Sequence, residues 1–218
     1  PFFKREDFTV FKAMDKKEGV GINIPIIYED DSLAVVDKPS GLLTVPTPKN
    51  ERRTLTSILG LYPCHRLDRD TSGLIIYAKT KLIQNKMMEE FRQRSVKKTY
   101  IAFVQGIPSR GQGVIRGRIE GLSAETGYKV IEKRSGFAIV EVMPTTGRTN
   151  QIRIHFKSIG HPILGESKYA FRRDFKIKAK RLCLHAAKLE FKHPENGKIL
   201  RLGAGLPQDL RAFLEKNV

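Results

Sequence analysis

Short apolar runs separated by turn signals dominate the chain. Residues 33–37 form an apolar run of strand length, and a turn at 38–41 follows it, because proline fixes φ and glycine reaches conformations that other residues avoid. Residues 99–104 are apolar on both faces, which is typical of a central strand. Asn196-Gly197 is a strong hairpin signal. Further strands are predicted at 74–79, 114–119, 128–133, 137–142, 187–191 and 199–202.

Apolar positions that recur every four residues indicate helices. Ile83, Met87 and Phe91 form such a stripe, and Thr80 can cap it, so we predict a helix from 80 to about 94. Strands outnumber helices, and hairpin-like connections dominate. We therefore predict an α+β fold with a mixed, mostly antiparallel central sheet flanked by helices. The other predicted helices cover 54–61, 149–158 with Gly160 after it, and the segment that follows Pro207.

The charge balance narrows the class of partner. Lysine and arginine number 40 against 23 acidic residues, which gives a formal net charge of +17. This excess favours a polyanionic partner, either nucleic acid or an anionic membrane surface. No run of about 18 apolar residues occurs, and the N-terminus lacks the layout of a signal peptide. We therefore expect no membrane association.

One basic run is denser than the rest of the chain. It covers 172–181, where phenylalanine and isoleucine interrupt the charges. A solvated face is the ordinary interpretation of such a run, but with this net charge we favour contact with phosphate groups. Its basic residues are Arg172, Arg173, Lys176, Lys178, Lys180 and Arg181.

The cysteine content indicates the cellular compartment, and the chain length limits the number of domains. Cys64 and Cys183 are the only cysteines, far apart and without metal-site spacing, which suits reduced thiols in a cytoplasmic protein. The 218 residues fit one large domain or two small ones.

The segment at 65–73 carries the candidate chemistry. It places Asp68 between Arg66 and Arg69, directly before the predicted strand at 74–79. Nearby positive charge favours an ionised carboxylate, and such a group can act as a nucleophile or a base. The alternative is an aspartate that caps the turn and pairs with a neighbouring arginine. From spacing alone this alternative is the commoner case.

The same segment resembles the signature of the RluA-type pseudouridine synthases. The resemblance implies that the protein isomerises uridine in RNA, detaching uracil from the sugar and rejoining it through C5. It implies further that Asp68 is the essential catalytic aspartate, acting as nucleophile or base. The resemblance extends from about residue 27 to residue 214 and includes further motifs at 36–42, 98–100, 146–155 and 160–165.

Three more site residues follow from the resemblance alone. Arg153 matches the basic residue that pairs with the aspartate, and Tyr100 matches the tyrosine that stacks on the target base. Arg66, next to His65, would fill the space left by the extruded base or hold the phosphate of the flipped nucleotide. Each has an ordinary alternative. Arg153 would be a surface arginine, Tyr100 a core tyrosine, and Arg66 an ion-pair partner for Asp70.

The chain departs from the family pattern at one motif position. Asn150 stands where family members usually carry histidine, which puts one supporting hydrogen bond in doubt. We expect residues 1–26 to be an N-terminal extension, too short for an accessory RNA-binding module. Residues 27–218 would then form the catalytic domain and select the target.

The expected partners follow from the reaction. We expect RNA, either ribosomal or transfer RNA, no obligate protein partner, and a monomer. The five histidines show no metal spacing and no nucleotide-binding or nucleophile-elbow pattern occurs, so we expect no metal and no cofactor.

Two other functions remain as alternatives. One is a catalytically silent RNA-binding protein on the same scaffold. The other is a nuclease or RNA glycosidase, which would need clustered acidic metal ligands or two cooperating carboxylates. Asp70 is the only close acidic neighbour of Asp68 in sequence, which makes this second alternative the weaker one.

Overall fold

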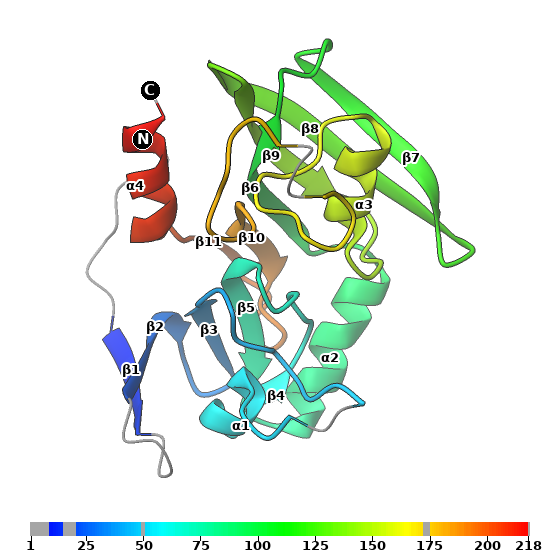
Figure 1. Ribbon diagram of the computed structural model, residues 1–218. Helices are drawn as coiled ribbons and strands as arrows, with labels where there is room; N and C mark the ends of the chain where they lie inside the picture. The colour runs from blue at the N-terminus through cyan, green and yellow to red at the C-terminus, as the bar shows by residue number, and fades with distance from the viewer. Residues whose placement is uncertain (1–8, 15–20, 49–50, 172–174, 218) are drawn as a thin grey trace. The chain divides into compact units, whose positions relative to one another are not determined.

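The computed structural model describes residues 9–14, 21–48, 51–171 and 175–217, and the chain divides into two compact units (Figure 1). Unit 1 comprises residues 1–96 and 186–205, and unit 2 comprises residues 97–185 and 206–218. Arg172 and Arg173 of the basic run lie outside the described residues. None of the described helices is long and apolar enough to cross a membrane.

Unit 1 is built on a sheet whose strands follow the order β1-β2-β3-β5-β10. The paired strands β1–β2, β2–β3 and β3–β5 are antiparallel. Two short additions extend the sheet, since β4 pairs with β5 and β11 pairs with β10, both antiparallel. The bounds are Thr9–Met14 for β1, Gly21–Glu29 for β2, Leu33–Lys38 for β3, Tyr62–Pro63 for β4, Ser72–Ala78 for β5, Leu184–Lys192 for β10 and Ile199–Gly203 for β11.

Strands β3, β5, β10 and β11 confirm the predictions made from the apolar runs and the Asn-Gly turn. Strands β1 and β2 were not predicted. Pro25 stands in the middle of β2. A proline normally indicates that a segment is not a strand, because it has no backbone N–H to donate to the hydrogen bonds between strands. In the structure Pro25 pairs with Val10 of β1.

Two helices belong to unit 1. Helix α1 covers Leu55–Leu59 and α2 covers Lys81–Arg92. The hydroxyl of Thr80 accepts the backbone N–H of Ile83 at 3.3 Å, which confirms the predicted cap. Helix α2 ends two residues earlier than predicted, and Arg94 adopts a left-handed φ of 60°.

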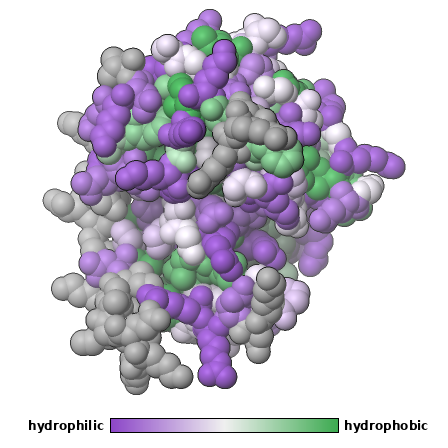
Figure 2. Space-filling view, viewed as in Figure 1, coloured by the Kyte–Doolittle hydropathy of each residue, from purple (hydrophilic) through white to green (hydrophobic). Residues whose placement is uncertain are grey.

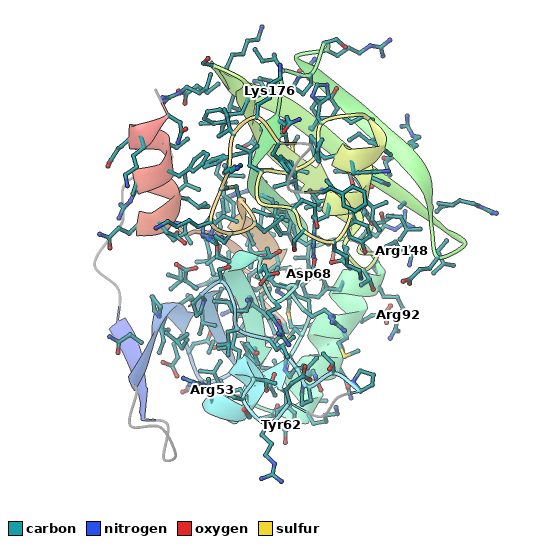
Figure 3. All side chains as sticks on the ribbon, in the orientation of Figure 1. Arg53, Tyr62, Asp68, Arg92, Arg148 and Lys176 are labelled. Carbon is teal, nitrogen blue, oxygen red and sulfur yellow. The ribbon has the colours of Figure 1, made fainter. Side chains whose placement is uncertain are left out.

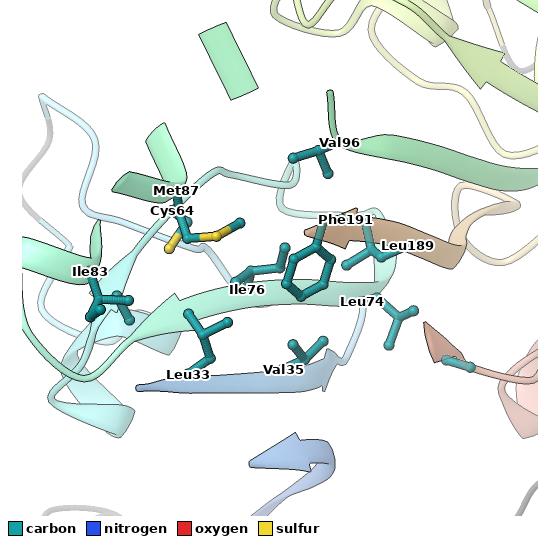
Figure 4. Close-up of a cluster of buried hydrophobic side chains, with 12 residues drawn as sticks. Leu33, Val35, Cys64, Leu74, Ile76, Ile83, Met87, Val96, Leu189 and Phe191 are labelled. Carbon is teal, nitrogen blue, oxygen red and sulfur yellow. The ribbon is translucent and has the colours of Figure 1, made fainter. Parts of the chain in front are cut away.

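The core of unit 1 is where the apolar stripe of α2 meets the sheet (Figure 4). Ile83 and Met87 of α2 are buried, as the four-residue spacing predicted, and Phe91 packs against the same cluster. The buried strand residues of this core are Leu33, Val35, Leu74, Ile76, Ala78, Leu189 and Phe191.

Unit 2 is an antiparallel sheet in the order β6-β9-β8-β7 with two helices. All four strands confirm sequence predictions, with longer bounds. Ile101–Val104 of β6 is fully buried, because β9 pairs on one side and the segments at 164 and 183 bond to Phe103 on the other. The bounds are Lys97–Gln105 for β6, Gln112–Ile119 for β7, Leu122–Arg134 for β8, Phe137–Pro144 for β9, Gln151–Ser158 for α3 and Gln208–Lys216 for α4.

Aromatic rings attach the last helix to this sheet. Phe213 of α4 lies 5.8 Å from the ring centroids of both Phe103 and Phe137. Helix α3 starts at Gln151, two residues later than predicted, because Asn150 takes the left-handed φ of 54° and so cannot continue a helix. Both units therefore support the predicted α+β fold with a mostly antiparallel sheet.

Gly73 in β5 allows a very close approach of two strands. It has a φ of +118°, and a Cβ atom there would lie 2.3 Å from the carbonyl oxygen and 2.5 Å from the nitrogen of Ala186 in β10. Both atoms belong to the backbone, so neither can rotate away. Only glycine fits this position.

We predict that Gly73→Ala lowers the free energy of unfolding by about 3 kcal/mol or more, since it combines a backbone clash with an unfavourable φ. Denaturant titration measures this change. Gly60→Ala is the matched control, because Gly60 also has a positive φ of +68° but open space around its Cβ position. The control should lose only about 1–2 kcal/mol. Equal losses in the two variants would contradict the close-packing argument.

Candidate active site

Asp68 lies in unit 1, in the loop that connects β4 to β5 (Figure 3). A turn follows it, in which the N–H of Thr71 donates to the carbonyl oxygen of Asp68 at 3.2 Å. Leu67 before it and Thr71 after it are buried, whereas the Asp68 side chain is only half-buried. Buried residues thus flank a half-buried Asp68 in this loop.

Lys38, at the end of β3, is the principal anchor of this loop. Its side chain is fully buried, at 0% exposure. The ammonium group donates three hydrogen bonds to backbone carbonyl oxygens. The acceptors are Leu42 at 2.6 Å, Pro39 at 2.9 Å and Arg69 at 3.0 Å. Because Arg69 directly follows Asp68, the buried charge connects the turn after β3 to the loop of Asp68.

Three more residues in or just after the same turn bind the Asp68 loop through four hydrogen bonds. The hydroxyl of Thr44 accepts the N–H of Leu67 at 3.2 Å and donates to its carbonyl oxygen at 2.9 Å. The N–H of Gly41 donates to the carbonyl oxygen of Arg69 at 2.9 Å. The hydroxyl of Ser40 donates to the carbonyl oxygen of Asp70 at 2.8 Å. The two motifs at 36–42 and 65–74 are therefore hydrogen-bonded to each other, and together they fix the position of the Asp68 loop.

His65 supports the loop from its other end. Its Nε2 accepts the backbone N–H of Ile76 at 3.0 Å, and its ring lies 4.7 Å from the ring centroid of Phe91. Since Nε2 accepts this bond, it carries no proton. His65 is thus part of the scaffold beside Asp68.

Arg66 is exposed and has no hydrogen bond or ion pair with any residue that the structure describes. The alternative in which it pairs with Asp70 is therefore not found. Arg69, the other neighbour of Asp68, pairs with Glu51 at 3.1 Å on the surface. Exposed pairs of this kind contribute little to stability.

Tyr100 and Arg153 belong to unit 2, whereas Asp68 and Arg66 belong to unit 1. Tyr100 stands near the start of β6, opposite Val142 of β9. It is half-buried, while Ile101–Val104 after it is fully buried. Tyr100 is therefore less buried than the four residues that follow it in the strand.

Arg153 of α3 is buried, at 7% exposure, so the surface-arginine alternative is wrong. Its Nε and Nη2 donate to the two carboxylate oxygens of Glu166, each at 2.7 Å. Its Nη1 donates to the side-chain oxygen of Asn150, also at 2.7 Å. Asn150 thus makes a supporting hydrogen bond at the position where the family usually has histidine.

Glu166 was not predicted as a site residue. It is 1% exposed, and besides Arg153 it accepts the backbone N–H groups of Lys168 at 2.7 Å and Tyr169 at 3.2 Å. Burial by itself would raise the pKa of Glu166, but these hydrogen bonds and the charge of Arg153 lower it below its usual value. The feature of the sequence that could have indicated Glu166 is its position directly after the motif at 160–165.

Gln151 organises the loop before α3. Its side-chain oxygen accepts the hydroxyl of Thr146 at 2.7 Å and the N–H of Arg148 at 3.0 Å. Its amide nitrogen donates to Glu125 and Thr126 of β8, both at 2.9 Å. All four hydrogen-bonding positions of this buried amide are thus used. They hold the loop at 145–150 against the sheet.

Residues 32–158 match the model of the RNA pseudouridylate synthase family. The dual-specificity RNA pseudouridine synthase RluA of Yersinia pestis is 39% identical, over 79% of this chain and 94% of its own length. The ribosomal large subunit pseudouridine synthase C of Haemophilus influenzae is 31% identical, over 98% of this chain and 74% of its own length. The chain belongs to the RluA-type pseudouridine synthase family.

The fold agrees with this assignment. A solved structure of human RNA pseudouridylate synthase domain containing 4 superposes with a TM-score of 0.75 at 26% identity, covering 88% of this chain and 92% of that one. The protein is an RNA pseudouridine synthase, and hence an isomerase that acts on uridines. The alternative of a catalytically silent RNA-binding protein is not supported.

We predict that Thr44→Val lowers the free energy of unfolding by about 1–3 kcal/mol, because the buried N–H and C=O of Leu67 both lose their partner. The synthase should also lose kcat, since this contact holds the Asp68 loop. Thermal unfolding and single-site turnover measure the two effects. Thr145→Val is the control, because its hydroxyl is exposed. Wild-type stability in Thr44→Val would contradict the proposed support.

Proposed function

We propose that this synthase isomerises specific uridines in ribosomal or transfer RNA, with Asp68 as its catalytic residue. The relatives support this target class, since one is named a dual-specificity RNA pseudouridine synthase and the other acts, by name, on the large ribosomal subunit. The observation that carries the proposal is the Asp68 loop, whose backbone is hydrogen-bonded on both sides of Asp68 while Asp68 itself is only half-buried.

The reaction moves one bond and leaves the composition of the nucleoside unchanged. The bond between the anomeric carbon and N1 of uracil breaks and a new one forms to C5. C5 gives up its proton, and N1 takes up a proton in its place. An ionised carboxylate next to the anomeric carbon can add to it or remove a neighbouring proton. Rigid support of Asp68 favours either route, since reaction needs the carboxylate held at a fixed place.

The other site residues complete the proposed mechanism. The guanidinium of Arg153 would offset the desolvation of Asp68 when a flipped base covers it. The ring of Tyr100 would stack on the uracil, which is worth about 1–3 kcal/mol per base. Arg66, exposed and unpaired among the described residues, would enter the space that the flipped base leaves or hold its phosphate.

The cellular setting is part of the proposal. We infer a cytoplasmic monomer whose catalytic domain is residues 27–218. Both cysteines are free and buried, and burial raises the pKa of each thiol to about 12, which suits a reducing compartment.

We predict that Asp68→Asn lowers turnover by about 10⁴-fold or more, since it removes the charge proposed to act on the sugar. Folding and RNA affinity should stay near wild type. Pseudouridine formation is read by tritium release from labelled RNA, and affinity by filter binding. Asp70→Asn is the matched control, because it changes a carboxylate two residues away. Near-normal turnover in Asp68→Asn would overturn the proposed mechanism.

Three lysines of the basic run are well placed for RNA contact. Lys176, Lys178 and Lys180 are exposed, whereas Phe175 is buried and Ile177 is half-buried. The side chains thus alternate, with the charges outward and the apolar groups inward. Hydrophilic residues also cover most of the face shown in Figure 2. We propose that these ammonium groups contact phosphates.

We predict that replacing these three lysines by glutamine weakens RNA binding and reduces the slope of log K against log salt by about 2–3, since each phosphate contact contributes about 0.7–0.9. Affinity measured at several salt concentrations gives the slope. The control replaces three other exposed lysines, Lys192, Lys198 and Lys216. An unaltered slope in the first variant would exclude the run from the interface.

A further inference from the structure

The pair formed by Arg153 and Glu166 is built differently from the other ion pairs of unit 2. Both partners are almost completely buried, at 7% and 1% exposure. The contact is bidentate, with both distances at 2.7 Å. By contrast, the other ion pairs described in unit 2 each include at least one exposed side chain, although Arg181 also contacts both carboxylate oxygens of its partner. They are Arg116–Glu125, Arg134–Glu132 and Arg181–Asp209.

This geometry fixes the direction of the guanidinium. Two parallel hydrogen bonds to one carboxylate set the plane of the group as well as its position. Asn150 holds the third nitrogen, and the ring of Tyr169 lies 5.4 Å from the central carbon of the guanidinium. Arg153 is therefore held from several directions and cannot turn without breaking a bond.

The carboxylate is held as firmly as the guanidinium. The backbone N–H groups of Lys168 and Tyr169 both donate to the carboxylate oxygen Oε1 of Glu166. Glu166 itself follows Gly165, where a Cβ atom would lie 1.9 Å from the carbonyl oxygen of Arg181. The close approach at Gly165 and the two backbone hydrogen bonds together hold the carboxylate in place.

Stability alone gives a weak reason for such a pair. Taking two charges out of water is costly, and well-packed apolar side chains often replace a buried ion pair without loss of stability. The geometry therefore points to a role for the pair in the reaction rather than in folding.

We propose that Glu166 is a positioning residue of this synthase, which acts by orienting the guanidinium of Arg153. Asn150 assists by holding the third guanidinium nitrogen. The inference rests on the role proposed above for Arg153. Glu166 itself contacts neither the RNA nor the reacting atoms in this scheme.

The test compares Glu166→Asp and Glu166→Gln. The aspartate keeps the charge but withdraws the carboxylate by one methylene, and the glutamine keeps the shape but loses one acceptor. We expect kcat to fall by about 100-fold in both, as misplaced catalytic groups produce, with KM for RNA near wild type. The assay runs at a temperature where circular dichroism shows both variants folded. If glutamine prevents folding, the aspartate variant carries the test.

Glu190 supplies the matched control. Its carboxylate accepts Nε of the exposed Arg201 at 2.8 Å on the hairpin of β10 and β11. Glu190→Asp and Glu190→Gln make the same chemical changes and should keep wild-type kcat and KM. A purely structural role for Glu166 would lower the melting temperature while leaving kcat unchanged, which would overturn the proposal.

A double-variant comparison separates this inference from the proposed function. If Glu166 acts through Arg153, then adding Glu166→Gln to Arg153→Lys should not lower kcat further. An additive loss, or loss in Arg153→Lys with full kcat in both Glu166 variants, would overturn only the role of Glu166. Wild-type kcat in Arg153→Lys would instead overturn the role proposed for Arg153, and this inference with it.

Discussion

A buried ammonium group holds the Asp68 loop of unit 1 in place. Lys38 has no exposed surface, yet its charge is surrounded by three carbonyl oxygens from two separate segments. Removing such a group would leave several buried acceptors without a donor, which is costly. The contacts of Ser40, Gly41 and Thr44 act on the same loop. The position of the half-buried Asp68 thus depends on contacts that include a fully buried lysine.

Much of the fold could be predicted because local signals agree with the final structure. The Thr80 cap, the apolar stripe of α2 and the Asn-Gly hairpin each depend on neighbours within a few residues. Strands β1 and β2 could not be found this way, since Pro25 contradicts the local pattern and pairing with β1 and β3 overrides it. The start of α3 was misplaced for a similar reason. The left-handed conformation of Asn150 is a property of the folded loop.

The candidate site was predictable in its residues but not in their supports. Asp68, Arg66, Tyr100 and Arg153 stand in motifs that a sequence displays directly. Lys38 reaches Arg69 across 31 positions, and Arg153 reaches Glu166 across 13, so no local pattern joins them. The doubt raised by Asn150 also needed the structure, because only the folded side chain shows that its oxygen accepts from Arg153.

The ion pair of Arg153 and Glu166 also has a consequence for how unit 2 assembles. Neither charge can leave water at acceptable cost before its partner arrives. Helix α3 and the chain around residue 166 are therefore expected to dock in the same step. A nascent chain that has emerged only as far as α3 cannot yet complete this part of the unit.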